Sequence, residues 1–331
     1  MAIFHGGDVW QSGAPTDYLD FSANLNPEGP PDWVRAALAE GLTRVSYYPD
    51  LRSRAALRGL SAHLRLPEDC VLPTAGGIEA AALAAKLAER HVIAQPTFQE
   101  YGHLCGAHRD VPREEAPGHR FSGNEALWIC NPNNPTGGAL SREALLELAE
   151  RADAAGGLLV VDEAFIDYCP EHSVADAVAR LPGLIVLGSL TKVLAIPGVR
   201  LGYLAAHPSV LRGLSEGLMP WRLNCLADAV ASALPGHEAD FERIRTLNET
   251  RREAFARALS ALGAKVAPSR ANFLLCDFGR DMRPSIESLR ERRILVRPCG
   301  MFPDLTHGHI RLCVCTEAEN ERLVETMKML K

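Results

Sequence analysis

The sequence lacks the features that would place the chain in a membrane or on nucleic acid. Its 331 residues contain no apolar run of the roughly 18 residues that suggests a membrane-spanning helix. Basic residues are not in excess, because 35 lysines and arginines stand against 41 aspartates and glutamates, a formal net charge of −6. Nucleic-acid-binding proteins usually carry a basic excess or stripe. We therefore expect neither a membrane nor a nucleic acid as partner.

The cysteines and the N-terminus also lack familiar patterns. The nine cysteines are an odd number, none forms a Cys-x-x-Cys pair, and several, such as Cys130 and Cys313, lie in apolar runs. This distribution favours buried free thiols over a disulfide framework or a metal site. The first eight residues show neither the basic nor the apolar stretch of a secretory signal. We expect a cytoplasmic protein without a bound metal.

Apolar material is plentiful, with 47% hydrophobic and 23% charged residues, which is typical of folded globular proteins. Short apolar runs alternate with longer amphipathic stretches, the pattern of a parallel sheet with crossover helices. The strands we predict are 70–73, 91–94, 127–130, 158–161, 185–187 and 201–204. Predicted helices include 79–89 and 142–155, the second with Ser141 as N-cap. The sequence predicts an α/β fold with a three-layer, doubly wound, mostly parallel sheet.

The pattern changes after about residue 235. A long charged helix at 238–262 is followed by shorter segments at 272–277, 285–292, 294–297 and 309–315, and by a final helix from 317. The first 35 residues are rich in Gly, Pro and Asn, and we expect an ordered arm, neither helix nor strand, that packs on the small unit or lines the cleft. The predicted parts are an arm at 1–35, a large domain at 36–235 and a small α+β domain at 236–331.

Lys192 follows the predicted strand at 185–187, at the edge where open parallel sheets bind ligands. A lysine amine that is desolvated or close to a cation can lose its proton and form Schiff bases with aldehydes. The hydroxyls of Ser189 and Thr191, the guanidinium of Arg200 and the helix start at Gly76-Gly77 together suit a phosphate. The alternative is that Lys192 and Arg200 are solvated surface residues.

Three more residues at strand ends suit an aromatic ligand. Asp162 would be partly desolvated at the sheet edge, where a protonated pyridine nitrogen would balance its charge. Asn134 could bond a phenolic oxygen, and Phe98 could stack on an aromatic ring. Each has a structural alternative: a turn cap for Asp162, an Asx-turn for Asn134 and a core position for Phe98.

Together these motifs resemble the aspartate aminotransferase superfamily, the fold-type I enzymes that depend on pyridoxal 5′-phosphate. Asn-Pro-x-Asn-Pro-Thr-Gly, Asp-Glu-Ala and Ser-x-Thr-Lys with an arginine eight residues later occur in the family's order. The resemblance implies that Lys192 binds the cofactor covalently, that Asp162 meets the pyridine nitrogen and that Asn134 meets the phenolic oxygen. The full set of implied cofactor-binding residues is Tyr48, Gly76, Gly77, Phe98, Asn134, Asp162, Ser189, Thr191, Lys192 and Arg200.

The resemblance also implies a homodimer with shared active sites. Tyr48 matches a tyrosine that reaches the phosphate of the neighbouring subunit, although it could instead be an interface or core aromatic. Two positions depart from the family pattern. Phe165 stands where many aminotransferases have a tyrosine that bonds the phenolic oxygen, and Thr74 stands where a glycine is usual. Transamination therefore does not follow from the resemblance alone.

Five segments, 5–8, 19–27, 96–101, 220–224 and 271–275, resemble the threonine-phosphate decarboxylases of cobalamin biosynthesis more than the related histidinol-phosphate aminotransferases. This implies decarboxylation of O-phospho-L-threonine. One alternative is an aminotransferase acting on a phosphorylated substrate such as histidinol phosphate. Another is a non-catalytic cofactor-binding protein, such as the effector half of a regulator. Threonine phosphate and serine phosphate differ by one methyl group, which the sequence does not distinguish.

A phosphorylated amino acid carries two anionic groups and therefore needs two cationic contacts. Arg311 resembles the family arginine that binds the anionic group of the substrate, and Arg297 is a second candidate cation. His5 and Asn24 are further candidates from the arm. The alternative for both arginines is an edge-strand charge that limits aggregation.

Overall fold

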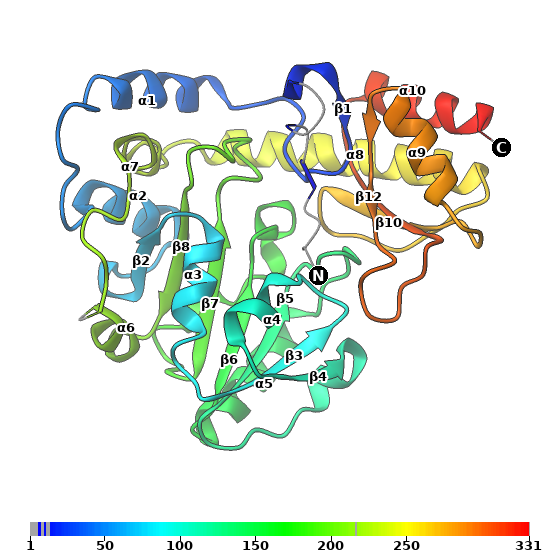
Figure 1. The fold of residues 1–331 in the computed structure, drawn as a ribbon. Helices are drawn as coiled ribbons and strands as arrows, with labels where there is room; N and C mark the ends of the chain where they lie inside the picture. Colours follow the sequence, from blue (N-terminus) through cyan, green and yellow to red (C-terminus); the bar gives the residue numbers. More distant parts are fainter. Residues whose placement is uncertain (1–5, 8–9, 11–13, 216, 331) are drawn as a thin grey trace.

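The computed structural model describes residues 6–7, 10, 14–215 and 217–330, and Figure 1 shows their ribbon. Its central sheet has seven strands in the order β2-β8-β7-β6-β5-β3-β4. β8 runs antiparallel to its neighbours β2 and β7, and the other neighbours are parallel. The strands are β2 (Val71–Thr74), β3 (Arg90–Gln95), β4 (Arg109–Pro112), β5 (Glu125–Cys130), β6 (Leu158–Asp162), β7 (Leu184–Ser189) and β8 (Gly202–Ala206). The predicted α/β class is confirmed.

Helices cover both faces of this sheet because successive strand residues point to opposite sides. In β5, Leu127 and Ile129 enter one core, whereas Ala126 and Trp128 enter the other. The first face is covered by α1 (Asp32–Leu42), α2 (Arg54–Leu64), α5 (Arg142–Ala154) and α7 (Cys225–Ser232). The second is covered by α3 (Gly77–Ala84), α4 (Glu100–Cys105) and α6 (Pro208–Ser215). The three layers place the carboxyl ends of the parallel strands at one edge.

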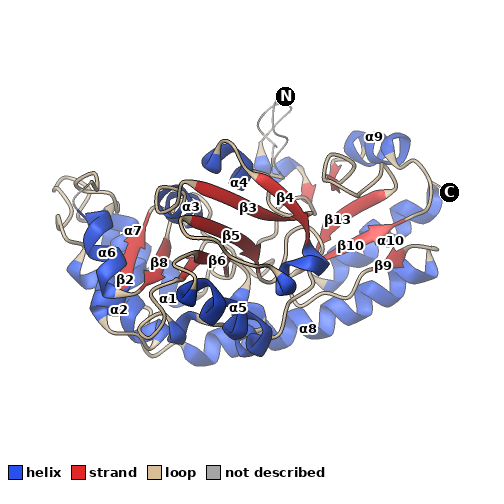
Figure 2. Ribbon diagram, turned by 90° about the horizontal axis from the view of Figure 1, so that it is seen from below, coloured by secondary structure: helices blue, strands red, loops and turns tan. Residues whose placement is uncertain are grey.

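A second, smaller sheet is antiparallel, with the order β12-β13-β10-β9. Its strands are β9 (Lys265–Val266), β10 (Phe273–Asp277), β12 (Arg297–Pro298) and β13 (His309–Cys313), and its helices are α8 (Glu238–Ala261), α9 (Arg283–Glu291) and α10 (Glu317–Met329). Figure 2 shows α8 extending from the large sheet to the small one. Phe241 of α8 packs in the core of the large sheet, and Phe255 packs in that of the small sheet. The predicted boundary at 235 lies just before this shared helix and stays a prediction.

The arm contains regular structure that the sequence analysis did not expect. Leu19–Asp20 forms strand β1, which pairs in parallel with β11 (Ile294–Leu295), and α1 begins at Asp32. A two-residue strand is too short to show an alternating pattern, so its neighbours alone determine it. Short 3₁₀ turns lie at Pro15–Asp17, Glu68–Cys70, Arg113–Gly118, Ile166–Tyr168, Pro170–His172 and Ala175–Ala177. Among the described residues, no helix has the length and apolar character needed to cross a bilayer.

Candidate active site

A cavity of about 250 Å³ lies at the carboxyl ends of β5, β6 and β7. Three parts of the chain contribute to it: the large sheet, the small sheet and the arm. The sequence-predicted residues that line it are Asn24, Gly77, Phe98, Asn134, Asp162, Ser189, Thr191, Lys192, Arg200, Arg297 and Arg311. The fold thus brings together side chains that are up to 287 residues apart in the sequence, as the difference between positions 24 and 311 shows.

Three other predicted site residues are placed differently. Gly76 lies just behind the wall, next to Gly77. Tyr48 is 82% exposed, its ring lies 4.8 Å from that of Trp221, and it is not among the residues that line the cavity. His5 lies outside the described residues. The single chain therefore brings together the predicted set apart from Gly76, which adjoins it, Tyr48, which lies elsewhere, and His5, which is not described.

Lys192 lies in the cavity wall, and its backbone oxygen accepts a hydrogen bond from the Asn26 amide at 3.0 Å. Burial, followed by the positive charges of Arg311 and Arg200, lowers the pKa of Lys192 to about 8. Asp162 acts in the opposite direction. A substantial fraction of this amine is therefore neutral close to pH 7–8, as nucleophilic attack on an aldehyde requires.

Asp162 ends β6, and both of its carboxylate oxygens are hydrogen-bonded. The hydroxyl of Tyr101 donates to Oδ2 at 2.5 Å, and the Ala164 amide donates to Oδ1 at 2.9 Å. Burial raises the pKa of Asp162, whereas these two donors and the charge of Lys192 oppose the rise. Asp162 therefore caps its turn, as the structural alternative supposed, and also faces the cavity.

In the loop after β5, one asparagine has a structural role and the next one faces the cavity. Asn133 is fully buried, and its side-chain amide donates to Thr136 Oγ1 at 2.8 Å and to the Pro96 oxygen at 2.9 Å. Asn134 lines the cavity, and its Oδ1 accepts from Arg311. The loop is thus stabilised by Asn133, which leaves Asn134 for a ligand. Phe98 is half-buried: it lines the cavity and also packs against the core on the second face of the sheet.

The glycine pair and the hydroxyls form a concave, cationic corner. Gly76 has a φ of +83°, and a Cβ there would lie 2.6 Å from Nη2 of Arg200, so this position requires glycine. The hydroxyls of Ser189 and Thr191 lie 2.7 Å apart, and α3 begins at Gly77 with its amides facing outward from the helix start. Arg200 is exposed at the rim of the cavity. Helix start, hydroxyls and guanidinium suit a phosphate.

Thr74 is one of the two positions that depart from the family pattern. Its hydroxyl is fully buried and donates to the Gly76 oxygen at 3.0 Å. The threonine therefore braces the glycine turn and does not fill the cavity. Phe165 accounts for the other departure, because it is 5% exposed and packs edge-to-face on Phe273 at 5.0 Å. An apolar ring thus occupies the place of a hydroxyl donor.

Two buried arginines line the opposite wall. Arg297 and Arg311 are register partners on β12 and β13, with exposed fractions of 4% and 6%. Arg311 donates to Asn134 Oδ1 and, at 2.7 Å, to the Ser22 oxygen. Burial, followed by the charge of Arg311, lowers the pKa of Arg297 to about 10. Neither is a solvated edge charge, and two cations buried side by side favour an anionic ligand.

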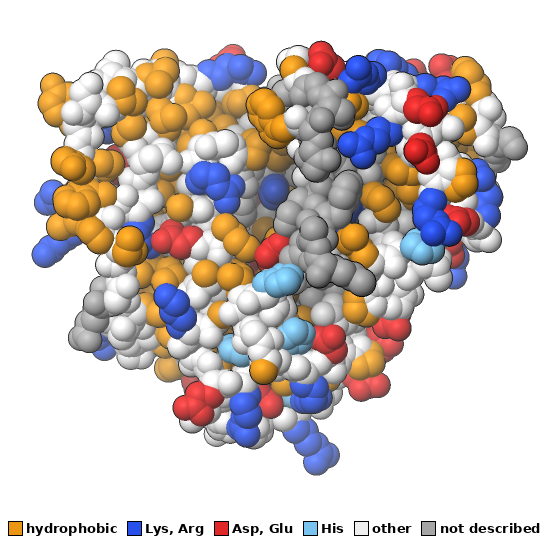
Figure 3. All heavy atoms as spheres, viewed as in Figure 1, with side chains coloured by type: hydrophobic (Ala, Val, Ile, Leu, Met, Phe, Trp, Pro, Cys, Tyr) orange, Lys and Arg blue, Asp and Glu red, His pale blue; other side chains and the backbone are white. Residues whose placement is uncertain are grey.

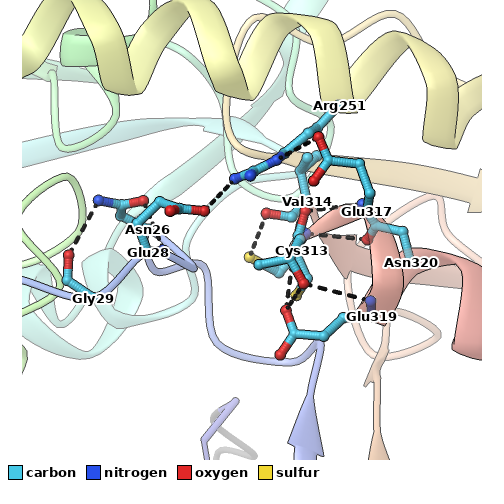
Figure 4. Close-up of polar contacts among 11 residues, drawn as sticks. Asn26, Glu28, Gly29, Arg251, Cys313, Val314, Glu317, Glu319 and Asn320 are labelled. Carbon is cyan, nitrogen blue, oxygen red and sulfur yellow. Dashed lines mark hydrogen bonds and ion pairs between the residues drawn. The ribbon is translucent and has the colours of Figure 1, made fainter.

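The arm is held at the cavity by contacts with Lys192 and with helix α8. Besides the Asn26 bond to Lys192, Glu28 pairs with Arg251 of α8 at 2.7 Å, and the same guanidinium contacts Glu317 of α10 at 3.1 Å (Figure 4). The arm places Asn24 in the wall, where its buried Oδ1 has no hydrogen-bond partner among the described residues. A buried polar atom without a partner is costly, so a polar ligand is expected there.

Taken together, the residues that line the cavity fit a phosphorylated aromatic aldehyde. It offers a partly neutral amine for the aldehyde, a carboxylate for a ring cation, an aromatic wall at Phe98 and the phosphate corner. Sequence reasoning missed Tyr101 as a site residue, although its segment was noticed. Nothing in the sequence indicates that Tyr101 bonds Asp162, which is 61 positions away.

Comparisons with known proteins agree with this geometry. The family model described as aminotransferase class I and II matches residues 16–327. Threonine-phosphate decarboxylase of Salmonella typhimurium is 33% identical over 99% of this chain and 97% of its own length. Histidinol-phosphate aminotransferase of Symbiobacterium thermophilum is 32% identical over 94% of this chain and 90% of its own. The crystal structure of L-threonine-O-3-phosphate decarboxylase from Porphyromonas gingivalis superposes with a TM-score of 0.84 at 25% identity, covering 94% of this chain and 98% of that one.

Proposed function

Because this chain belongs to the aminotransferase class I and II family and uses pyridoxal 5′-phosphate, we propose that it decarboxylates O-phospho-L-threonine. The products would be (R)-1-aminopropan-2-yl phosphate, which serves the aminopropanol linker of cobalamin, and CO₂. The observation that carries the proposal is the pair of buried arginines, Arg297 and Arg311, in a cavity that also holds Lys192. The 33% identity to a threonine-phosphate decarboxylase over nearly the whole chain supports it.

The cofactor would be held by the residues predicted from the sequence. Lys192 would bind it covalently, Asp162 would meet its ring nitrogen and Asn134 its phenolic oxygen. Phe98 would stack on the ring, and the phosphate would be bound by Gly76, Gly77, Ser189, Thr191 and Arg200. When bound, the cofactor supplies an electron sink for the bond that breaks at the α-carbon of the substrate.

The side chains of the cavity would decide which bond breaks, because that depends on substrate orientation. Arg311 and Arg297 would bind the two anionic groups of the substrate by charge-assisted hydrogen bonds. Asn24 and His5 are the further candidates for substrate contact. In the balanced reaction the α-carboxylate leaves as CO₂ and the α-carbon gains a proton. Lys192, with its pKa of about 8, can hold that proton on Nζ and deliver it.

The test is to incubate the holoenzyme with O-phospho-L-threonine and no oxo acid. We expect CO₂ and the amino alcohol phosphate in equal amounts. Conversion of the cofactor to pyridoxamine phosphate, with turnover only after an oxo acid is added, would contradict the proposal. Running O-phospho-L-serine in parallel measures how far the extra methyl group contributes, which is expected to be on the order of 10–200-fold in kcat/KM.

A second candidate is an aminotransferase for a phosphorylated substrate such as histidinol phosphate. The 32% identity to a histidinol-phosphate aminotransferase over 94% of the chain favours it. Incubation with histidinol phosphate and 2-oxoglutarate distinguishes the two activities. A protein that only binds the cofactor would change its absorbance with substrate but form no product.

We also propose a cytoplasmic homodimer with shared sites. Large apolar side chains are exposed over α1, the following loop and the loop before α7, where Figure 3 shows hydrophobic side chains gathered at the left edge. These residues are Leu42, Val45, Tyr47, Tyr48, Leu51, Met219 and Trp221. Contiguous apolar patches commonly mark protein interfaces, and Tyr48 lies in this one. The nine cysteines are free thiols, which suits a reducing compartment.

A further inference from the structure

Tyr101 connects two walls of the cavity without lining it. It is 0% exposed at the start of α4, and its hydroxyl donates to Oδ2 of Asp162 at 2.5 Å. Its ring meets that of Phe98 edge-on, with centroids 5.5 Å apart and planes at 82°. One buried side chain therefore contacts both the carboxylate proposed for the ring nitrogen and the ring proposed for stacking.

The phenol is the donor in its hydrogen bond with Asp162. Burial, followed by the negative charge of Asp162, raises the pKa of Tyr101 well above its usual value, so the hydroxyl keeps its proton. A donor to a buried carboxylate favours its ionised form. Among the described residues, the only other hydrogen bond to the Asp162 carboxylate comes from the Ala164 amide, on the other oxygen. Without the phenol, one fewer hydrogen bond would oppose the rise in the pKa of Asp162 that burial causes.

The position of Tyr101 is itself fixed by packing. Its ring lies 5.3 Å from that of Trp128, which is fully buried in β5, and Trp128 donates to His91 of β3 at 3.2 Å. The strands that bear Trp128 and His91 are adjacent in the central sheet. The packing against Trp128 therefore holds the hydroxyl toward Asp162.

We propose that Tyr101 is a positioning residue that acts through Asp162 and Phe98 to hold the cofactor ring. This inference rests on the proposed cofactor roles of those two residues. It predicts that the hydroxyl contributes to cofactor binding although it does not touch the cavity. It also predicts that the contribution passes through the Asp162 carboxylate.

Tyr101→Phe removes the hydroxyl and keeps the ring. In the holoprotein we expect the dissociation constant for pyridoxal 5′-phosphate to rise roughly tenfold, since the hydrogen bond is to a charged group. We also expect the visible circular dichroism of the bound cofactor to change, because that signal reports how rigidly the ring is held. Tyr168→Phe is the matched control, a buried tyrosine outside the cavity lining, and it should leave both signals unchanged.

A double-mutant cycle makes the test independent of any general loss of stability. In an Asp162→Asn background, Tyr101→Phe should have little further effect on cofactor affinity, because the charged partner is already absent. An equal loss in both backgrounds, an equal loss in Tyr168→Phe, or wild-type affinity and dichroism in Tyr101→Phe would each overturn the inference. The proposed function is tested separately, by CO₂ release from the wild-type protein.

Discussion

Lys192 shows how surroundings give one side chain its chemistry. Its segment, Ser189-Leu190-Thr191-Lys192, was recognisable from the sequence, and so was the need for desolvation or a nearby cation. The structure supplies both, because burial and two arginines lower its pKa to about 8. The sequence could not indicate that one of those arginines is Arg311, 119 positions later, because that proximity arises only when the small sheet packs beside the large one.

The lowered pKa predicts how fast the apoprotein captures pyridoxal 5′-phosphate at different pH values. Only the neutral amine attacks the aldehyde, so the rate should rise with pH and level off above about 8. Arg311→Gln removes a neighbouring positive charge, so the midpoint should move to higher pH. Stopped-flow absorbance over pH 6–10 measures both profiles. A wild-type midpoint near the ordinary lysine value of 10.5 would contradict this account.

Arg311 is the residue on which substrate binding should depend most. Removing one partner from a buried, charge-assisted contact commonly costs 2–5 kcal/mol, so Arg311→Ala should lower kcat/KM for phosphothreonine by on the order of 10²–10³-fold. Arg311→Lys keeps the charge but loses the two-pronged geometry, and it should recover only part of the loss. Arg212→Ala, on helix α6 outside the cavity lining, serves as control. Unchanged kinetics in Arg311→Ala would assign this arginine a structural role.

At the scale of elements, apolar runs in the sequence located the buried strands of the large sheet but not its exposed edge strand, β4. All six predicted strands are present, whereas β4 was missed because Arg109–Pro112 is polar and largely exposed. The predicted N-cap of α5 is confirmed, since Ser141 Oγ accepts from the Ala144 amide at 3.2 Å. A buried strand is visible in the sequence as an apolar run, whereas an exposed edge strand has no such run.

Successive side chains along a strand point to opposite faces, so Asp162 and Glu163 at the end of β6 have different surroundings. Asp162 faces the cavity, whereas the Glu163 carboxylate accepts from Ser173 Oγ at 2.7 Å and from the Val174 amide at 2.8 Å. Glu163 therefore ties the 3₁₀ turns after β6 to the strand. Burial raises the pKa of Glu163 to about 7, even though both donors oppose the rise.

The raised pKa predicts a pH-dependent stability. The folded state binds the Glu163 proton more tightly than the unfolded chain, so this contribution is fully present below about pH 4.5 and is lost as pH rises through about 7. Glu163→Gln cannot titrate, and it should flatten the decline in unfolding free energy between pH 5 and 8 by on the order of 1–3 kcal/mol. Urea unfolding of both holoproteins across that range measures the difference. Parallel curves would show that Glu163 does not titrate with folding.

At the scale of the whole molecule, the sequence indicated the layers but not the order of the strands. The antiparallel insertion of β8 between β2 and β7 follows from long-range pairing, as in the register of Val71 with Ala205. Likewise, no local pattern shows that α8 contributes to the cores of both sheets. The arm, expected to be irregular, is partly a strand because β11 offers it an edge.

The proposed shared sites predict complementation between two impaired variants. Tyr48→Ala should weaken both sites of its own dimer, and Lys192→Ala should inactivate both of its own. After the two proteins are mixed and exchange subunits, one site of each hybrid has an intact Lys192 and receives Tyr48 from the other chain. Activity should rise above the sum of the two variants as hybrids of twice 35.9 kDa form. Hybrids that form without regaining activity would place Tyr48 outside the neighbouring site.

The central claim is that one amine binds the cofactor, and the chain has only five lysines with which to test it: Lys86, Lys192, Lys265, Lys328 and Lys331. Borohydride reduction of the holoprotein makes the link to the cofactor permanent, and peptide mass spectrometry then locates it. We predict that the label is found on Lys192 and that Lys192→Ala is unlabelled and has almost no turnover, whereas Lys265→Ala behaves as wild type. A label on another lysine, or none in a protein that still turns over phosphothreonine, would contradict the account.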